Sequence, residues 1–435
     1  PAGLSAAYYL ATRGYKPTVF EKSARPGGMM TYGIPSFKLE KTIIDAEIQV
    51  LRELGVEIRC GVEVGRDVTI PQLREQGFLA FYIAIGCQGG RLPGVPGEHA
   101  AGTDIAVHFL HEALADENQH MDGRVVVIGG GNVAVDCART AVRFGAEAVS
   151  MVCLESRDTM PASKDEIAEA EEEHIEIHTG WGPKELLQDE SGHVTAVVFK
   201  KCLRTIDPET GKFAPVYDEA ETITLPADHV VFAIGQAIEW GGLLKDTKVT
   251  FHRGNYPVAD PLTYQTAEAD IFVGGDVYHG PKFVIDAIEE GKCAAESLHR
   301  YVHKGASLTI GRNRRDFVML DKENFSVNCY DHAARQTEAV DPAVEAHSFR
   351  DARKTLTSEQ VQTETARCLG CGASWVDPNK CIGCGVCTTK CVFDAIHLKR
   401  DHPECSTMMK AEDKLKGIAS MACKRLGQTL RGRKG

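Results

Sequence analysis

The stretch RVVVIGGGNVA, residues 124–134, decides the fold of this 435-residue chain. It opens with an apolar, β-branched run of the kind that forms a buried parallel strand. Three glycines follow in the pattern G-x-G-x-x-A, and residues 135–144 then predict a helix that Gly145 ends. In this arrangement backbone N–H groups at a helix N-terminus can approach a pyrophosphate. The stretch therefore predicts a Rossmann-type dinucleotide site.

The next predicted strand, residues 148–154, ends in Glu155. An acid at that position accepts hydrogen bonds from a free ribose and favours NAD(H). Arg157 follows two residues later and could instead hold the 2′-phosphate of NADP(H). Both readings stay open, and we favour NAD(H) because Glu155 would repel a 2′-phosphate.

The start of the chain predicts half of a second such unit. Residues 4–13 have helical spacing of apolar residues, Gly14 ends the helix, and a short strand then leads to Glu21. Gly3 fits the third glycine of G-x-G-x-x-G, and Glu21 fits the acid that binds a ribose. The first strand and two glycines would precede residue 1, so we expect the chain to be a fragment of a longer one.

Three related strands predict the order of the domains. YIAIG (82–86) and VFAIG (231–235) are near-repeats, and IFVGGD (271–276) has the same style but ends in an acid. We expect an α/β protein with two Rossmann-like three-layer domains. An FAD-binding domain would take residues 1–105 and 241–300, with an NAD(P)-binding domain inserted at 106–240. Residues 301–365 would form a linker or a segment that wraps over the core.

The cysteines are unevenly placed. Of 15, seven precede residue 368 and eight lie from there to the end. Cys381, Cys384, Cys387 and Cys391 follow the bacterial ferredoxin spacing, C-x-x-C-x-x-C-x-x-x-C, which is typical of a [4Fe–4S] cluster. Zinc usually takes two separated pairs. We therefore expect a small α+β ferredoxin-like domain at residues 366–400, in which Gly383 and Gly385 let the loop curve around the cluster.

The number of clusters stays open at one or two. In two-cluster ferredoxins the fourth cysteine of such a run serves the other cluster. A second cluster would use Cys368 and Cys371 with Cys391 and either Cys405 or Cys423. The tail, residues 401–435, is basic and could steer an acidic ferredoxin onto the chain, although we favour the simpler interpretation of a solvated or frayed terminus.

Overall composition narrows the class of protein. The chain has 49 Lys and Arg against 61 Asp and Glu, a net charge of −12, which is a poor basis for binding nucleic acid. Its apolar runs are strand-sized, so no membrane span is predicted. The cysteine pattern favours the cytoplasm over secretion. No C-x-x-C or C-x-x-x-x-C pair occurs before residue 368, which disfavours a thiol-reducing enzyme. The acidic stretch 165–176 is expected to be a solvated helix face.

The chain resembles one family, the glutamate synthase small (beta) subunit and its FAD/NAD(P)-dependent relatives. The resemblance rests on PAGLSAAYYLATRGY (1–15), RPGGMMTYGIP (25–35), GGGNVAVDCARTAVRFGA (129–146), ESRDTMPAS (155–163) and IFVGGDVYHGPKFVIDAIEEGKCAA (271–295). It implies that FAD lies against Gly3, Glu21, Gly28, Gly86, Gly275 and Asp276, with Asp276 on the ribityl chain. It implies that NAD(P) lies against Gly129, Gly131, Asn132, Glu155 and Arg157.

Two departures stand out. NADPH-using members usually carry paired arginines where this chain has Leu154 and Glu155, which weakens an assignment to NADPH. Members also often have an N-terminal iron–sulfur domain, which we expect to be either truncated from this sequence or replaced by its C-terminal cysteines.

The resemblance implies electron transfer from NAD(P)H through FAD and [4Fe–4S] to a ferredoxin or a larger oxidoreductase or synthase subunit, or the reverse. A flavin belongs between the other two because it exchanges both hydride and single electrons. Two alternatives stay open. The chain could be a glutamate synthase small subunit, or a non-catalytic subunit that holds clusters for electron wiring or assembly.

Overall fold

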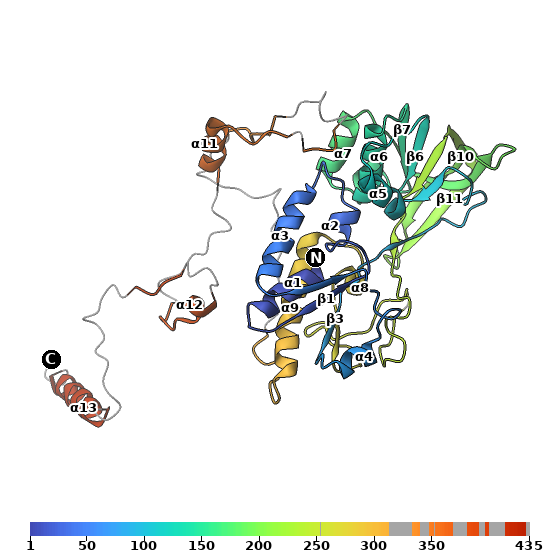
Figure 1. Cartoon of the computed structure of the whole chain (residues 1–435). Helices are drawn as coiled ribbons and strands as arrows, with labels where there is room; N and C mark the ends of the chain where they lie inside the picture. Colours follow the sequence, from blue (N-terminus) through green and yellow to red (C-terminus); the bar gives the residue numbers. More distant parts are fainter. Residues whose placement is uncertain are drawn as a thin grey trace. The chain divides into compact units, whose positions relative to one another are not determined.

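The computed structural model describes residues 1–252, 254–312, 333–339, 348–351, 353–368, 381–390, 396–399 and 414–431. The chain divides into two compact units. The first comprises Pro1–Asn328 with Ala334–Thr363, and the second comprises Cys329–Ala333 with Glu364–Gly435. The first unit holds both predicted nucleotide-binding parts (Figure 1).

The predicted NAD(P)-binding part, called the nicotinamide part below, is built on a parallel sheet with the strand order β5-β12-β6-β7-β8. Its central strand is the predicted apolar run, and successive side chains enter opposite cores. Val125 and Val127 pack on the helix side, while Val126 and Ile128 pack on the other side. The strands are β5 (Thr103–Ile105), β6 (Arg124–Ile128), β7 (Ala148–Cys153), β8 (Glu176–Thr179) and β12 (His229–Phe232).

Three layers result, as predicted. Helices α5 (Ala106–Ala115), α6 (Asn132–Arg143) and α7 (Lys164–Glu172) contribute to the core on one face of the parallel sheet. An antiparallel sheet of β9 (Trp181–Gln188), β10 (Val194–Ile206) and β11 (Phe213–Pro226) packs on the other face through residues such as Val197 and Phe199 (Figure 1).

The predicted FAD-binding part, called the flavin part below, is assembled from two segments that are distant in sequence. β3 (Phe81–Ile83) pairs in parallel with β14 (Ile271–Val273), and α1 (Ala2–Ala11) packs along α9 (Val284–Val302). A Cβ at Gly291 of α9 would lie 2.2 Å from the carbonyl oxygen of Ala2, so a glycine is needed where the two helices meet. The chain returns to this part after the parallel sheet of the nicotinamide part.

Smaller elements complete the first unit. β1 (Thr18–Glu21) pairs in parallel with β2 (Glu57–Cys60), and β4 (Gly89–Gly90) pairs antiparallel with β13 (Gln236–Ala237) where the chain crosses between the two parts. The others are α2 (Met29–Tyr32), α3 (Lys41–Glu53), α4 (Ile70–Glu75), the 3₁₀ turn η1 (Arg157–Thr159) and α8 (Asp276–His279).

In the second unit the described secondary structure is α12 (Val386–Lys390), α13 (Lys414–Arg431) and the end of α11 (Ser358–Ala366). Much of the predicted ferredoxin-like domain, and of the predicted linker 301–365, lies outside the described residues. Among the helices that the structure describes, none has the length and apolar character needed to cross a bilayer.

Candidate dinucleotide and iron–sulfur sites

One cavity of about 1700 Å³ runs through the first unit and is shared by both nucleotide-binding parts. Most of the residues predicted to bind a nucleotide line it: Gly3, Glu21, Gly28, Gly86, Gly129, Gly131, Asn132, Glu155 and Asp276. Two predicted residues, Gly275 and Arg157, are not among those lining it. The structure thus brings together residues from both ends of the matched sequence around one space.

The glycine loop of the nicotinamide part is shaped by close packing on one side and openness on the other. A Cβ at Gly129 would lie 2.4 Å from the carbonyl oxygen of Ala233, whereas nothing lies within 4 Å of a Cβ at Gly131. The loop is held by the N–H of Gly129, which donates to the carbonyl of Val152 at 2.8 Å. Gly131 therefore leaves room for a phosphate at the N-terminus of α6.

The two candidate ribose residues differ in placement. Glu155 follows β7 and lines the cavity. The guanidinium of Arg157 instead forms an ion pair with Glu171 at 2.5 Å. In this structure Arg157 is therefore engaged with an acid.

The flavin part offers a similar cradle. Gly28 has a φ of +58°, and the nearest atom to a Cβ there belongs to Pro1 at 3.9 Å, so its backbone faces open space. The carboxylate of Glu21, the last residue of β1, accepts the N–H of Ser23 at 2.8 Å, which fixes its position. Gly86 follows β3 with a φ of +68°. A flat or phosphate-bearing ligand can approach the backbone closely at these positions.

Asp276 begins α8 at the wall of the cavity. Its carboxylate accepts the N–H of Lys282 at 3.2 Å. Burial raises the pKa of this carboxyl above its usual value. A carboxylate with one backbone partner and a face toward the cavity is available to accept a hydrogen bond from a hydroxyl of the ligand.

Glu290 was missed by the sequence analysis. This buried residue of α9 accepts the N–H of Gly275 at 2.5 Å and contacts Nδ1 of His279 at 2.5 Å. It thereby holds the turn that carries Asp276. The burial of Glu290 could have been predicted from its position, because it falls on the same helix face as the buried Ala287 and Ala294.

The donor set and the space fit FAD together with a nicotinamide dinucleotide. Both glycine turns leave backbone open to the cavity, and an acid follows a strand in each part, at Glu21 and at Glu155. The shared cavity of about 1700 Å³ is lined by residues of both parts.

Two buried cysteines near the glycine turns, Cys87 and Cys153, are not activated. Burial raises the pKa of Cys87, next to Gly86, to about 12. Burial likewise raises the pKa of Cys153 to about 12. A thiol must ionise to attack a disulfide, so neither is suited to thiol exchange at neutral pH.

Four of the six predicted cluster ligands are described, and all four are exposed free thiols: Cys368, Cys381, Cys384 and Cys387. Cys387 lies in α12, and the preceding loop turns at Gly383 (φ +67°) and Gly385 (φ +76°). Cys371 and Cys391 lie outside the described residues, as does Cys405.

The acidic stretch was interpreted wrongly as a solvated face. Glu173 is only 5% exposed and forms ion pairs with Arg139 and Arg143. Glu166 and Glu169 also form ion pairs, with Lys38 and Arg139 respectively. The inward side of α7 is therefore a network of buried charges, which composition alone does not predict.

Comparison with known proteins identifies the two parts of the chain. Residues 1–291 match the family described as pyridine nucleotide-disulphide oxidoreductase, and residues 374–397 match the 4Fe-4S binding domain. These matches confirm the predicted resemblance and the predicted kinds of cofactor.

The curated proteins that the chain resembles are named as subunits of dehydrogenases and glutamate synthases. The chain is 36% identical over 380 residues to the NADP(+)-dependent formate dehydrogenase subunit beta of Moorella thermoacetica, covering 85% of this chain and 53% of that one. It is 35% identical over 319 residues to a glutamate synthase [NADPH] small chain of Halomonas elongata, covering 69% and 66%. It is 33% identical over 310 residues to the NAD-dependent dihydropyrimidine dehydrogenase subunit PreT of Escherichia coli, covering 71% and 68%. The chain thus spans about half to two thirds of these relatives.

Solved structures support the fold. FprA of Mycobacterium tuberculosis, in complex with NADPH, superposes with a TM-score of 0.58 at 17% identity, covering 69% of this chain and 82% of that one. A thioredoxin reductase of Lactococcus lactis gives 0.53 at 22% identity, covering 69% and 96%. The chain therefore belongs to the pyridine nucleotide-disulphide oxidoreductase family, which implies binding of FAD and NAD(P)H, and it carries a 4Fe-4S binding domain in its C-terminal part.

Proposed function

We propose that the chain is an oxidoreductase subunit that takes hydride from a nicotinamide and delivers single electrons to a partner protein. The observation that carries the proposal is the single cavity lined by both glycine turns, in a chain that also has a ferredoxin cysteine run. When bound, FAD supplies the exchange between two-electron and one-electron chemistry. The protein's task is to orient the two nucleotides and exclude water.

The residues divide by role. Gly129, Gly131 and Asn132 would hold the nicotinamide pyrophosphate, and Glu155 its ribose. Gly3, Glu21, Gly28, Gly86 and Gly275 would surround the FAD, and Asp276 would accept a hydrogen bond from its ribityl chain. Cys381, Cys384 and Cys387 would bind one cluster with Cys391 or a remote cysteine as fourth ligand, and Cys368 and Cys371 would belong to a second.

We favour NADH as the donor. Glu155 lines the cavity at the end of β7, and the guanidinium that could have held a 2′-phosphate, on Arg157, forms an ion pair with Glu171. A carboxylate at this position accepts hydrogen bonds from a ribose diol and repels a phosphate.

The acceptor is a ferredoxin or a larger partner subunit in the cytoplasm. Support comes from the relatives, which are named as a formate dehydrogenase subunit and as glutamate synthase small chains. The second of these names favours one specific alternative, a glutamate synthase small subunit that feeds electrons to a separate synthase subunit. The free thiols among the described cysteines are consistent with a reducing compartment.

Anaerobic titration of the full-length, FAD-loaded and cluster-reconstituted protein tests the proposal. We expect NADH to bleach the flavin absorbance at lower concentration than NADPH. Failure of both nucleotides to bleach it would instead support a non-catalytic subunit that only carries electrons between clusters.

Iron and sulfide analysis counts the clusters. We expect Cys384→Ser to lose cluster iron, because it removes a ligand in the middle of the ferredoxin run. Unchanged iron content in Cys368→Ser would exclude the second cluster.

A further inference from the structure

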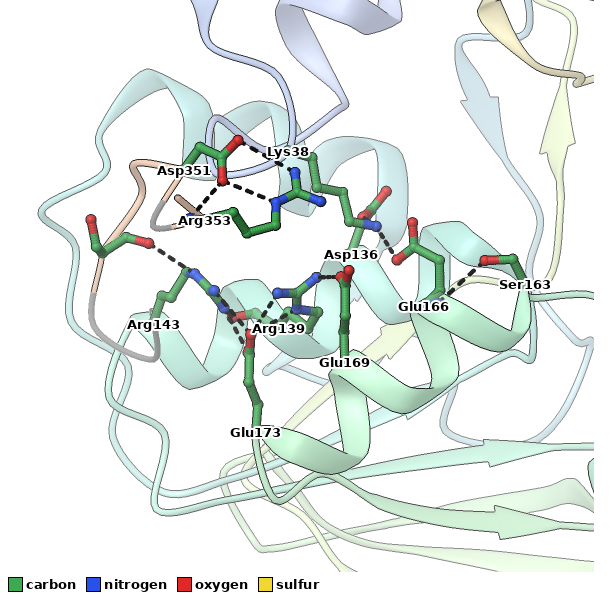
Figure 2. A network of polar contacts seen from close by, with 11 residues as sticks. Lys38, Asp136, Arg139, Arg143, Ser163, Glu166, Glu169, Glu173, Asp351 and Arg353 are labelled. Carbon is green, nitrogen blue, oxygen red and sulfur yellow. Dashed lines mark hydrogen bonds and ion pairs between the residues drawn. The ribbon is translucent and has the colours of Figure 1, made fainter. Parts of the chain in front are cut away.

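Lys38 joins the two nucleotide-binding parts by charge. It lies between α2 and α3 in the flavin part, and its ammonium forms ion pairs with Asp136 of α6 and Glu166 of α7 in the nicotinamide part (Figure 2). The three side chains are 16%, 11% and 21% exposed. Ion pairs between such poorly exposed side chains are shielded from water, and salt screens them less than it screens exposed pairs.

The two carboxylates depend on this lysine. They come from separate helices and meet at one ammonium, so without it two like charges would face each other in a poorly hydrated wall. Burial raises the pKa of Asp136, and the charge of Lys38 opposes that rise.

The same carboxylates are tied to the nucleotide-binding turn. Asn132, one helical turn before Asp136, accepts the N–H of Ser163 through its side-chain oxygen at 2.9 Å. Ser163 in turn caps α7 by accepting the N–H of Glu166 at 3.3 Å. The N–H of Ala162 donates to the carbonyl of Gly130 at 3.0 Å. A displacement of Glu166 or Asp136 is thereby transmitted to the turn at Gly130 and Asn132.

The residue next to Lys38 strengthens the same junction. The guanidinium of Arg143 lies 3.8 Å from the ring centre of the buried Phe37, and Arg143 is itself held by Glu173. Phe349 packs on Phe37 with ring centres 6.2 Å apart, and the carbonyl of Ser348 accepts a hydrogen bond from Arg143 at 3.0 Å. Lys38 therefore sits beside a packed aromatic and charged contact between the two parts.

Lys38 also lines the cavity, together with Asn132, Asp136 and Glu166. We propose that Lys38 is a positioning residue for hydride transfer, whose ammonium fixes the glycine turn of the nicotinamide part relative to the flavin part. This inference rests on the proposed function for its kinetic consequence. Hydride transfer requires close alignment of donor and acceptor, and a displacement of about 1 Å can slow such a step by about 10²-fold.

Lys38→Met in the FAD-loaded full-length protein removes the charge and keeps most of the side-chain volume. We expect the limiting rate of flavin reduction at saturating nicotinamide to fall by about 10²-fold, with little change in the concentration that gives half of that rate. Lys38→Arg should retain most of the rate, because it keeps the charge. Lys184→Met is the matched control, since the contacts of Lys184 with Glu219, an ion pair at 3.9 Å and a hydrogen bond to its carbonyl at 3.3 Å, are solvent-exposed.

Hydrogen exchange of the FAD-loaded protein without nicotinamide gives a second readout. We expect faster exchange at residues 35–40 and 132–136 in Lys38→Met, and wild-type exchange in Lys184→Met. Glu166→Gln, a milder change, should move both readouts in the same direction by a smaller amount, and it keeps the test available if Lys38→Met does not fold.

Wild-type exchange in both segments of Lys38→Met, or a loss confined to nucleotide affinity, would overturn the inference. In the latter case Lys38 would be a ligand contact. A wild-type protein that neither nicotinamide reduces would overturn the proposed function, whereas the exchange comparison would still decide whether Lys38 links the two parts.

Discussion

The nicotinamide part and the flavin part carry similar glycine turns but are stabilised differently. The nicotinamide part is nearly contiguous in sequence, and its central strand is buried on both faces by neighbouring elements. The flavin part depends on the pairing of β3 with β14 and of α1 with α9. Buried charge ties the end of α7 to α6 in the first part, through Glu173, and holds the turn before α8 in the second part, through Glu290. Variants of these two glutamates should therefore fail in different ways.

Among these variants, we expect the largest change in free energy from Glu173→Gln, which acts on the stability of the fold. This carboxylate pairs with two arginines whose side chains are 3% and 0% exposed, so its loss leaves part of their buried positive charge unbalanced, although Glu169 still pairs with Arg139. We expect the free energy of unfolding to fall by about 3–5 kcal/mol, measured by urea denaturation. Glu171→Gln is the control, because its pair with Arg157 is 52% exposed on the glutamate side and should be worth under about 1 kcal/mol. Equal losses in the two variants would contradict the account.

A smaller and more local effect is expected from Glu290→Gln. The turn at Gly275 would lose a charged acceptor, and we expect FAD binding to weaken by about 1–3 kcal/mol while the nicotinamide part stays folded. The release of FAD, monitored by the fluorescence of the free flavin, measures this change in affinity. Glu289→Gln, one residue away on the exposed side of α9, should bind FAD as the wild type does. Uniform destabilisation of the whole unit by Glu290→Gln would remove the distinction between the two parts.

The smallest effect concerns selectivity within the nicotinamide part. Glu155→Gln removes the negative charge beside the expected ribose and should raise the ratio of NADPH to NADH efficiency by about tenfold, or about 1.4 kcal/mol. The ratio is measured from flavin reduction at several concentrations of each nucleotide. Asp158→Asn, in the nearby turn η1, serves as the charge-matched control. An unchanged ratio in Glu155→Gln would show that this carboxylate does not read the ribose.

Features encoded locally were predictable from the sequence. The strand, glycine turn and helix at 124–144 depend on a short window, and the cysteine spacing depends on a single loop. The order of the two nucleotide-binding parts was a prediction from the three related strands at 82–86, 231–235 and 271–276.

Features that depend on partners distant in sequence were not predictable. Lys38 lies in an unremarkable loop, and nothing local indicates that it meets Asp136 and Glu166. The acidic helix looked solvated because its buried partners, Arg139 and Arg143, belong to another helix. Arg157 looked available for a phosphate because Glu171 approaches it only in the folded chain. Charge pairing of this kind is decided by tertiary packing, not by composition.

Rapid mixing of the anaerobic, FAD-loaded and cluster-reconstituted protein with NADH tests the central claim most directly. The account predicts that flavin absorbance is lost first and that the reduced-cluster signal follows, and that Cys384→Ser keeps the first phase while losing the second. Cluster reduction without any preceding loss of flavin absorbance, or no reaction with either nicotinamide, would contradict it.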